Sequence, residues 1–244
     1  MTLICMMMVS CGKKKHNGHE YVDLGLSVKW ATCNVGAITP EDYGDYFAWG
    51  ETSPKDEYTE DNCSTCGKQM SDIAGNAQYD AATANWGGDW RMPTKAEQEE
   101  LLYNCTWTWT TQNGVNGYNV KGPNGNSIFL PAAGSRFESS LYGAGSEGDY
   151  WGSTPYDDSD DYSDDYSYFF DHLYDDSDDD SDDYSYFFGP FYDYSDDYSD
   201  DYSYFLGPPF YNLSYGLDLY SYDDDQYMIH YNRGYGLSVR PVVE

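Results

Sequence analysis

The chain has 244 residues, a formal net charge of −31 and a mean hydropathy of −0.75. Its 43 acidic side chains against 12 lysines and arginines argue against a nucleic-acid-binding protein, because contacts to phosphate need basic residues. No run of 18 apolar residues occurs, so we expect no transmembrane helix.

The first eleven residues, MTLICMMMVSC, are apolar and lead into a lysine run. Met8-Val9-Ser10-Cys11 resembles the lipobox of bacterial lipoproteins, in which the cysteine carries lipid after cleavage. We therefore expect residues 1–11 to be a lipoprotein signal peptide. A truncated or misassigned start would explain why no basic residue precedes the apolar run. The alternative is an apolar terminus that is not a signal.

Residues 12–19 have the composition of a polar linker, so His16 and His19 are expected to be solvated rather than to bind a metal. Beyond them, Tyr21 to Val35 and Asp45 to Trp49 are rich in β-branched and aromatic residues and predict strands. Glu51 to Ala82 is polar and predicts a loop.

Four cysteines follow the proposed signal peptide. Cys33 could pair with Cys105, and Cys63 with Cys66, but sequence alone does not set the connectivity. A structural zinc site is disfavoured because the chain has a single CxxC motif.

The clearest local signal is Arg91-Met-Pro-Thr-Lys-Ala-Glu97, in which Thr94 precedes a run of good helix formers and Glu97 lies three residues on. That spacing is a capping box and predicts a helix from about Lys95 to Asn104. Further strands are expected at Thr106 to Thr111, Gly117 to Lys121, Ser127 to Pro131, Tyr150 to Thr154, Gln226 to His230 and Tyr235 to Val243.

These elements predict an α+β domain. Gly25 to Lys29 and Gly236 to Arg240 repeat the pattern Gly-Leu-Ser-Val-basic at opposite ends of the chain. We expect these two segments to pair and to bring the ends of the domain together.

Between the strands, Gly152 to Asp225 uses only ten amino-acid types and contains 23 Asp and 16 Tyr. Units of the form SDDYSDDYSYFF begin at Ser159, Ser177 and Ser195, a period of 18 residues. Without these aspartates the chain has 20 acidic against 12 basic residues, a net charge of −8 (20 acids less 12 bases leaves 8). Mutual repulsion among the aspartates should keep residues 156–212 extended and solvated.

Seven motifs in order resemble a known family: HEYVDLGLSVKWATCNVGA, DYGDYFAWGE, WRMPTKAEQEELL, CTWTWT, IFLPAAGSR, DYWGSTP and GLSVRPV. They are similar to the major paralogous domain first named in Fibrobacter and widespread in gut Bacteroidales. The resemblance implies a C-type lectin-like fold over residues 20–244, in the variant that formylglycine-generating enzymes use, interrupted by the acidic repeats.

The same resemblance does not extend to catalysis or to calcium-dependent sugar binding. Formylglycine-generating enzymes use a late cysteine pair, whereas no cysteine follows Cys105. The Glu-Pro-Asn, Gln-Pro-Asp and Trp-Asn-Asp motifs of sugar-binding lectins are absent. We therefore predict a binding protein and not an enzyme, with no catalytic residues, no cofactor and no dedicated metal site.

The chain also resembles the variable proteins of diversity-generating retroelements. In those proteins the codons of the last strands and loops of a lectin-like domain are randomised at adenines. Randomised AAC or AAT codons yield all ten residue types of the segment and exclude Lys, Glu, Gln, Met and Trp, which it lacks. Tandem duplication of an 18-residue unit is the rival explanation for its repeats.

Tyrosine, serine and asparagine form adaptable binding surfaces, as in antibody loops. The expected binding residues are Tyr211, Tyr215, Tyr220, Tyr222, Asp223, Asp224, Tyr227, His230, Tyr231, Asn232 and Tyr235. The alternative for Tyr227 and Tyr231 is that they face the core.

The sequence thus predicts a lipoprotein of the bacterial cell envelope, anchored to the outer membrane through Cys11, whose ligand is an unidentified protein or other cell-surface molecule. Two alternatives remain. One is a structural surface protein with an acidic spacer whose Asp clusters bind calcium weakly. The other is an enzyme of the formylglycine-generating type, disfavoured for the reason above.

Overall fold

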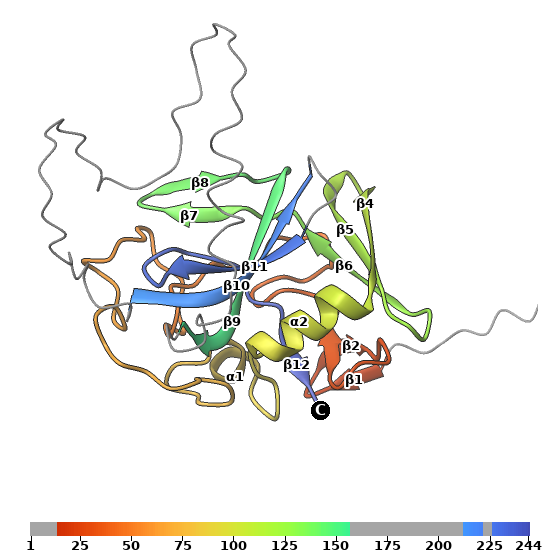
Figure 1. Cartoon of the computed structure of the whole chain (residues 1–244), viewed down its shortest axis with the longest axis horizontal. Coiled ribbons are helices and arrows are strands. Elements are labelled where there is room, and N and C mark those ends of the chain that lie inside the picture. The colour runs from red at the N-terminus through yellow and green to blue at the C-terminus, as the bar shows by residue number, and fades with distance from the viewer. Residues whose placement is uncertain (1–13, 157–211, 222–225) are drawn as a thin grey trace, which may run out of the picture. The chain divides into compact units, whose positions relative to one another are not determined.

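A computed structural model describes residues 14–156, 212–221 and 226–244 (Figure 1). The proposed signal peptide with Cys11, the acidic repeats, and the predicted binding residues Tyr211, Tyr222, Asp223 and Asp224 lie outside the described residues.

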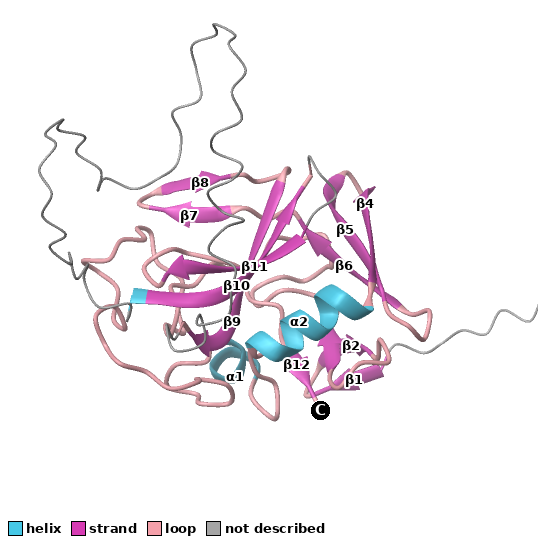
Figure 2. Cartoon of the chain, viewed as in Figure 1, coloured by secondary structure: helices cyan, strands magenta, loops and turns pink. Residues whose placement is uncertain are grey.

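Strands predominate over helices in the described residues (Figure 2). The two helices are α1 (Ala81–Trp86) and α2 (Lys95–Asn104). The strands are β1 (Lys14–His16), β2 (His19–Val22), β3 (Lys29–Ala31), β4 (Thr106–Gln112), β5 (Val115–Lys121), β6 (Ser127–Pro131), β7 (Ser135–Phe137), β8 (Ser140–Tyr142), β9 (Glu147–Pro155), β10 (Leu213–Tyr220), β11 (Gln226–Asn232) and β12 (Val242–Val243). They form small antiparallel sheets, so the predicted α+β class is confirmed.

The first sheet has the order β1-β2-β3-β12 and joins the two ends of the domain. Trp30 of β3 lies opposite Val242 of β12. The two ends of the domain are therefore paired, but the expected pairing of Gly25–Lys29 with Gly236–Arg240 is wrong, because Lys29 and Trp30 pair with Val243 and Val242. Residues 25–28 are not in a strand, and residues 236–238 form bridges to Phe47, Arg136 and Tyr150 instead.

The single strand expected from Tyr21 to Val35 is two strands, β2 and β3. The chain turns between them at Gly25, which has a φ of 79° that side chains rarely adopt. The Gly25 amide donates to Asp23 Oδ1 at 2.8 Å, a local hydrogen bond typical of Asp in turns.

The prediction of a solvated linker at residues 12–19 is wrong for residues 14–19. β1 and β2 form a hairpin that turns at Asn17 and Gly18. His19 stacks on Trp86 with ring centroids 3.7 Å apart, and His16 meets Trp90 edge-on at 5.8 Å. Burial, with a smaller contribution from Lys15, lowers the pKa of His19. The two histidines contact aromatic rings because the hairpin packs against α1 and the loop after it.

Helix α2 has the bounds predicted from its capping box. Thr94 Oγ1 accepts the Glu97 amide at 3.3 Å, and Glu97 Oε2 accepts the Thr94 amide at 2.9 Å. Arg91 donates to both Glu97 carboxylate oxygens at 2.6 and 2.7 Å. Among the described helices, none has the length and apolar character needed to cross a membrane.

Helix α1 overlaps the end of the region predicted as loop. Asp80 is its N-cap and accepts the Thr83 amide at 3.0 Å. The other oxygen of Asp80 accepts the amides of Gly75 and Met92, so one buried carboxylate fixes three segments. The strand expected from Asp45 to Trp49 is reduced to a bridge between Phe47 and Leu237.

The predicted strands after α2 are confirmed as the sheet β4-β5-β6. Trp107 and Trp109 of β4 pack edge-on against Tyr118 of β5, at 5.7 and 5.0 Å. Because side chains alternate along a strand, Thr106, Thr108 and Thr110 of β4 lie on the opposite side of this sheet. Hairpin β7-β8, which follows it, was not predicted.

The sheet β9-β10-β11 contains the longest strands of the domain (Figure 1). β9 and β11 were predicted, with shorter bounds, whereas β10 lies within the compositionally biased segment and was not. Trp151 of β9 belongs to one buried cluster with Trp49 and Leu237. Its neighbour Tyr150 belongs to another, with Leu217 and Leu219 of β10. Apolar clusters therefore pack on both sides of this sheet.

A disulfide joins Cys63 to Cys66, as one of the predicted pairs. The other candidate pair, Cys33 and Cys105, is not formed, since both are free thiols. Cys33 follows β3 and lies 3.7 Å from the Ile38 carbonyl, whereas Cys105 ends α2 and packs against the cluster that contains Tyr150. Burial raises the pKa of Cys105 to about 11.

Candidate ligand-binding face

Six of the seven described residues of the predicted site lie on β10 and β11, but they do not form one surface. Side chains opposite each other in an antiparallel pair project to the same side, and successive side chains alternate. The register places Tyr215 opposite His230, and Tyr231 opposite Ser214. Tyr215 and His230 therefore share one side of the sheet, and Tyr231 lies on the other.

Tyr220 and Tyr227 are on the same side of the sheet as Tyr231. Tyr227 lies opposite Asp218, and Tyr220 is two residues further along β10. The exposed fractions are 36% for Tyr220 and 50% for Tyr227, so both are exposed, Tyr220 only just. We call these two tyrosines, at the end of the β10-β11 pair next to residues 222–225, the tyrosine face.

Tyr231 faces inward, as the alternative reading proposed. Its ring meets Trp151 edge-on at 5.9 Å, and its hydroxyl donates to Asp149 Oδ1 at 2.9 Å. The ring lies over Gly216, where an added Cβ would come within 3.1 Å of Tyr231 Cδ2 and of the Tyr150 carbonyl. A side chain at position 216 would therefore require the Tyr231 ring or the Tyr150 carbonyl to move by a few tenths of an ångström.

Two buried carboxylates lie beneath the tyrosine face. Asp149 of β9 and Asp218 of β10 are opposite each other in the register and are 3% and 2% exposed. Burial, together with the charge of Asp149, raises the pKa of Asp218 to about 8, and burial raises the pKa of Asp149. Two such neighbouring carboxyl groups cannot both ionise readily, so the pair holds a proton at neutral pH.

Further groups surround this pair. Ser135 and Tyr231 hydrogen-bond to Asp149, and the Tyr220 hydroxyl bonds to Asp218. Glu147, two residues before Asp149, has its pKa raised by burial and by the Asp149 charge. Tyr220 thereby connects the exposed face to the buried acids.

The other side of the sheet holds a second aromatic group, formed by Tyr156, Tyr215 and His230. The Tyr156 ring lies 5.5 Å from Tyr215 and 4.6 Å from His230. Lys95 of α2 places its ammonium 4.0 Å from the Tyr215 ring centroid, a cation–π contact. Tyr215 is buried, so His230 is the exposed member of this group that comes from the predicted site.

The opposite end of the strand pair is fixed by polar contacts. Asn232 and Asn212 both donate to Glu60 Oε1. The buried Arg233 donates to the Leu213 carbonyl at 3.1 Å and to the Lys68 carbonyl at 2.9 Å. Asn232 therefore anchors β11 to the loop that contains the disulfide and is not an exposed ligand contact.

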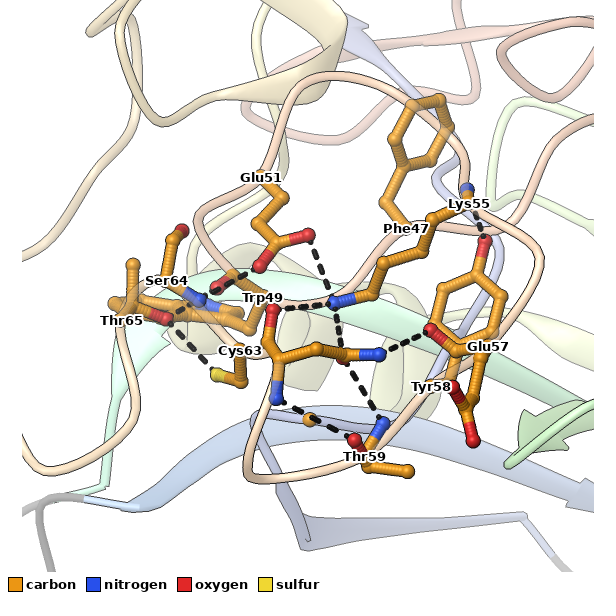
Figure 3. A network of polar contacts seen from close by, with 12 residues as sticks. Phe47, Trp49, Glu51, Lys55, Glu57, Tyr58, Thr59, Cys63, Ser64 and Thr65 are labelled. Carbon is orange, nitrogen blue, oxygen red and sulfur yellow. Dashed lines mark hydrogen bonds and ion pairs between the residues drawn. The ribbon is translucent and has the colours of Figure 1, made fainter.

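That loop is itself held by a dense polar network (Figure 3). Lys55 forms an ion pair with Glu51 at 3.0 Å and donates to Asn62 Oδ1 at 2.8 Å. Glu51 also accepts the Ser64 amide at 2.7 Å, and Thr65 donates to the Trp49 carbonyl at 2.5 Å. The network fixes the loop from Trp49 to Thr65, and through Glu60 the loop fixes the strand pair.

Tyr235 lies apart from the tyrosine face, because it follows β11 and packs edge-on with Phe137 of β7 at 5.1 Å. Sequence reasoning missed Asp149, Asp218 and Arg233, the buried charged residues that organise the strand pair. The Leu217-Asp218-Leu219 alternation predicts that Asp218 faces solvent, so the sequence carried no signal for its burial. Among the described residues, no three His, Cys, Asp or Glu side chains are grouped to hold a metal ion.

Comparison of the chain with protein-family models, with curated proteins and with solved structures found no match.

Proposed function

We propose that this chain is an envelope-anchored lipoprotein that binds a cell-surface ligand through a Tyr/Asp/Ser-rich face carried by a C-type lectin-like scaffold. Within the described residues the face centres on Tyr220 and Tyr227. Tyr222, Asp223 and Asp224, which the sequence predicts as binding residues, lie outside the described residues. A diversified origin, as in retroelement variable proteins, accounts for the restricted alphabet of residues 152–225.

The observation that carries this proposal is the contrast between an exposed pair of tyrosines and the rigid sheet beneath it. Tyrosine offers a large amphipathic surface at low entropic cost, and binding is strongest where the contact residues are held in place beforehand. The sheet has apolar clusters on both sides, and Asn232 and Arg233 anchor its far end.

The lectin-like scaffold is supported by the seven sequence motifs, by the paired terminal strands and by the capped helix between them. The lipid anchor at Cys11 rests on the lipobox resemblance. Incorporation of labelled palmitate into the full-length chain, and its loss in Cys11→Ala, tests the anchor separately from ligand binding.

The second candidate is a structural surface protein whose acidic segment is a spacer. The 18-residue repeats favour it, because duplication changes length without creating a specific surface. Its aspartates would bind calcium weakly and irregularly. Comparing natural copies of the gene separates the two origins: substitutions at adenine positions accompany a diversified face, and changes in repeat number accompany a spacer.

A binding experiment tests the main proposal directly. The labelled full-length chain is applied to an array of bacterial and host cell-surface proteins, beside Tyr220→Ala/Tyr227→Ala and the control Tyr103→Ala. Tyr103 is a 75% exposed tyrosine on α2, outside the face. We expect at least one array protein to bind the wild type and Tyr103→Ala and to lose at least 90% of its signal with the double variant. Equal signals for all three, or no binding at all, would contradict the proposal.

A further inference from the structure

A cleft of about 400 Å³ lies away from the tyrosine face, between the first sheet and the sheet β4-β5-β6. Tyr21 and Val22 of β2 line one part of it, and Asn119 and Phe129 of β5 and β6 line another. Its volume is within the range of small-molecule sites in proteins. A shallower extension follows the outer side of β4 past Thr108 and Thr110, and Asn119 and Gln112 line both parts.

The walls combine apolar surface with uncharged hydrogen-bonding groups. Tyr21, Val22 and Pro40 supply the accessible apolar part, and the buried Ile128 and Phe129 lie behind it. The polar part consists of amides and hydroxyls, which both donate and accept hydrogen bonds. It comprises Thr32, Thr108, Thr110, Thr111, Gln112, Asn119, Asn126 and Ser127.

Several of these groups are fixed in position without a ligand. Asn126 Nδ2 donates to the Asp23 carbonyl at 2.8 Å, and Gln112 Nε2 donates to Glu41 Oε1 at 2.5 Å. Each of these amides keeps its oxygen as an acceptor. Among the described residues no side-chain hydrogen bond engages Asn119, which stands where the cleft and its extension meet. A preformed cleft lined by an amide without a side-chain hydrogen bond is suited to a polar ligand.

The charges of the cleft restrict the ligand further. Its ionisable lining consists of Lys14, Asp23 and the phenol of Tyr21. One lysine is too little to hold a phosphate group or a polyanion. One aspartate, whose Oδ1 already accepts the Gly25 amide, is too little to hold a calcium ion, which takes six to eight oxygen ligands.

From this geometry we propose that the cleft binds a neutral, hydroxyl-rich ring compound, a short neutral saccharide, without a metal ion. The ring's C–H face packs on Tyr21, and its hydroxyls exchange hydrogen bonds with Asn119, Gln112 and Asn126. This cleft is separate from the tyrosine face, and the saccharide proposal goes beyond the proposed function. An experiment can therefore contradict one of the two proposals without affecting the other.

The test is calorimetric titration of the full-length chain with neutral tetrasaccharides of glucose, mannose, xylose and N-acetylglucosamine, in EDTA. We expect at least one to bind with a Kd of 1 mM or tighter. Asn119→Asp keeps the size and one acceptor but removes the amide donor, and Asn119→Ala removes both. We expect each to weaken binding about tenfold or more, the effect of about one lost hydrogen bond.

The matched control is Thr106→Ala, an exposed residue on β4 outside the lining, which should leave the Kd within twofold. Thermal unfolding of each variant establishes that it is folded, and if both Asn119 variants unfold, Gln112→Ala replaces them. The proposal is overturned if none of the four saccharides binds, if binding requires calcium, or if the Asn119 variants bind as tightly as the wild type.

Discussion

Replacement of Asp218 by Asn should remove a pH dependence of stability that the buried acid pair creates. Asp218 is 2% exposed and lies opposite Asp149, and its pKa is raised from 3.8 to about 8 by burial and then by that neighbouring charge. A raised carboxyl pKa means that the folded chain binds more protons than the unfolded chain between these two values. The free energy of unfolding is therefore highest at acidic pH and falls as the pH rises towards 8.

The magnitude follows from the size of the shift. One pKa unit corresponds to about 1.4 kcal/mol, so a shift of about four units bounds the loss at about 6 kcal/mol. Relaxation and water entry reduce such penalties in real proteins. We therefore expect a loss of about 2–3 kcal/mol between pH 5.5 and 8, a window above the pKa range of ordinary exposed carboxylates.

The assay is urea unfolding followed by tryptophan fluorescence at pH 5.5, 6.5, 7.5 and 8. Asp218→Asn, which keeps the shape of the side chain and cannot ionise, should reduce the slope of stability against pH by at least half. The control Asp56→Asn removes one exposed negative charge elsewhere. Its free energy of unfolding should depend on pH as that of the wild type does. The reasoning fails if wild-type stability is constant or rises across this window, or if Asp218→Asn and Asp56→Asn have the same slope.

Two further predictions concern the scaffold. Gly216→Ala should destabilise the chain by about 1–3 kcal/mol, because the new methyl group would meet Tyr231 and the Tyr150 carbonyl; an unchanged urea midpoint would contradict this packing. Thr94→Ala should lower the free energy of unfolding by about 1 kcal/mol, because it removes the cap of α2. Thr94→Ser keeps the hydroxyl and should lower it by less than half of that. Equal losses of stability for the two variants in thermal unfolding would show that the hydroxyl is not the cause.

Local signals in the sequence predicted much of the fold. The bounds of α2 were correct because the Thr94–Glu97 capping box is complete within four residues. β6 was correct because an apolar run stands between clear turns. The hairpin of β1 and β2 was not predicted because His16 and His19 are polar, and their packing on Trp86 and Trp90 depends on residues about 70 positions away.

The candidate site was harder to predict. A strand's two-residue alternation and its register decide which tyrosines share a side, and the register of β10 cannot be read from a segment whose composition is uniform. Tyr215 and Tyr231 were grouped with Tyr227 from residue type alone. The structure places Tyr215 on the other side of the sheet and Tyr231 over Gly216. Asp218 was overlooked because it is one aspartate of 23 in the segment.

Hydrogen–deuterium exchange with and without a bound array protein tests the central claim most directly. Residues 213–220 and 226–232 make up the strand pair that carries the tyrosine face. If the tyrosine face is the binding surface, amides at the end of this pair near Tyr220 and Tyr227 should exchange at least tenfold more slowly in the complex, and those of β4 should be unchanged. Protection confined to other strands, with none in β10 or β11, would contradict the account.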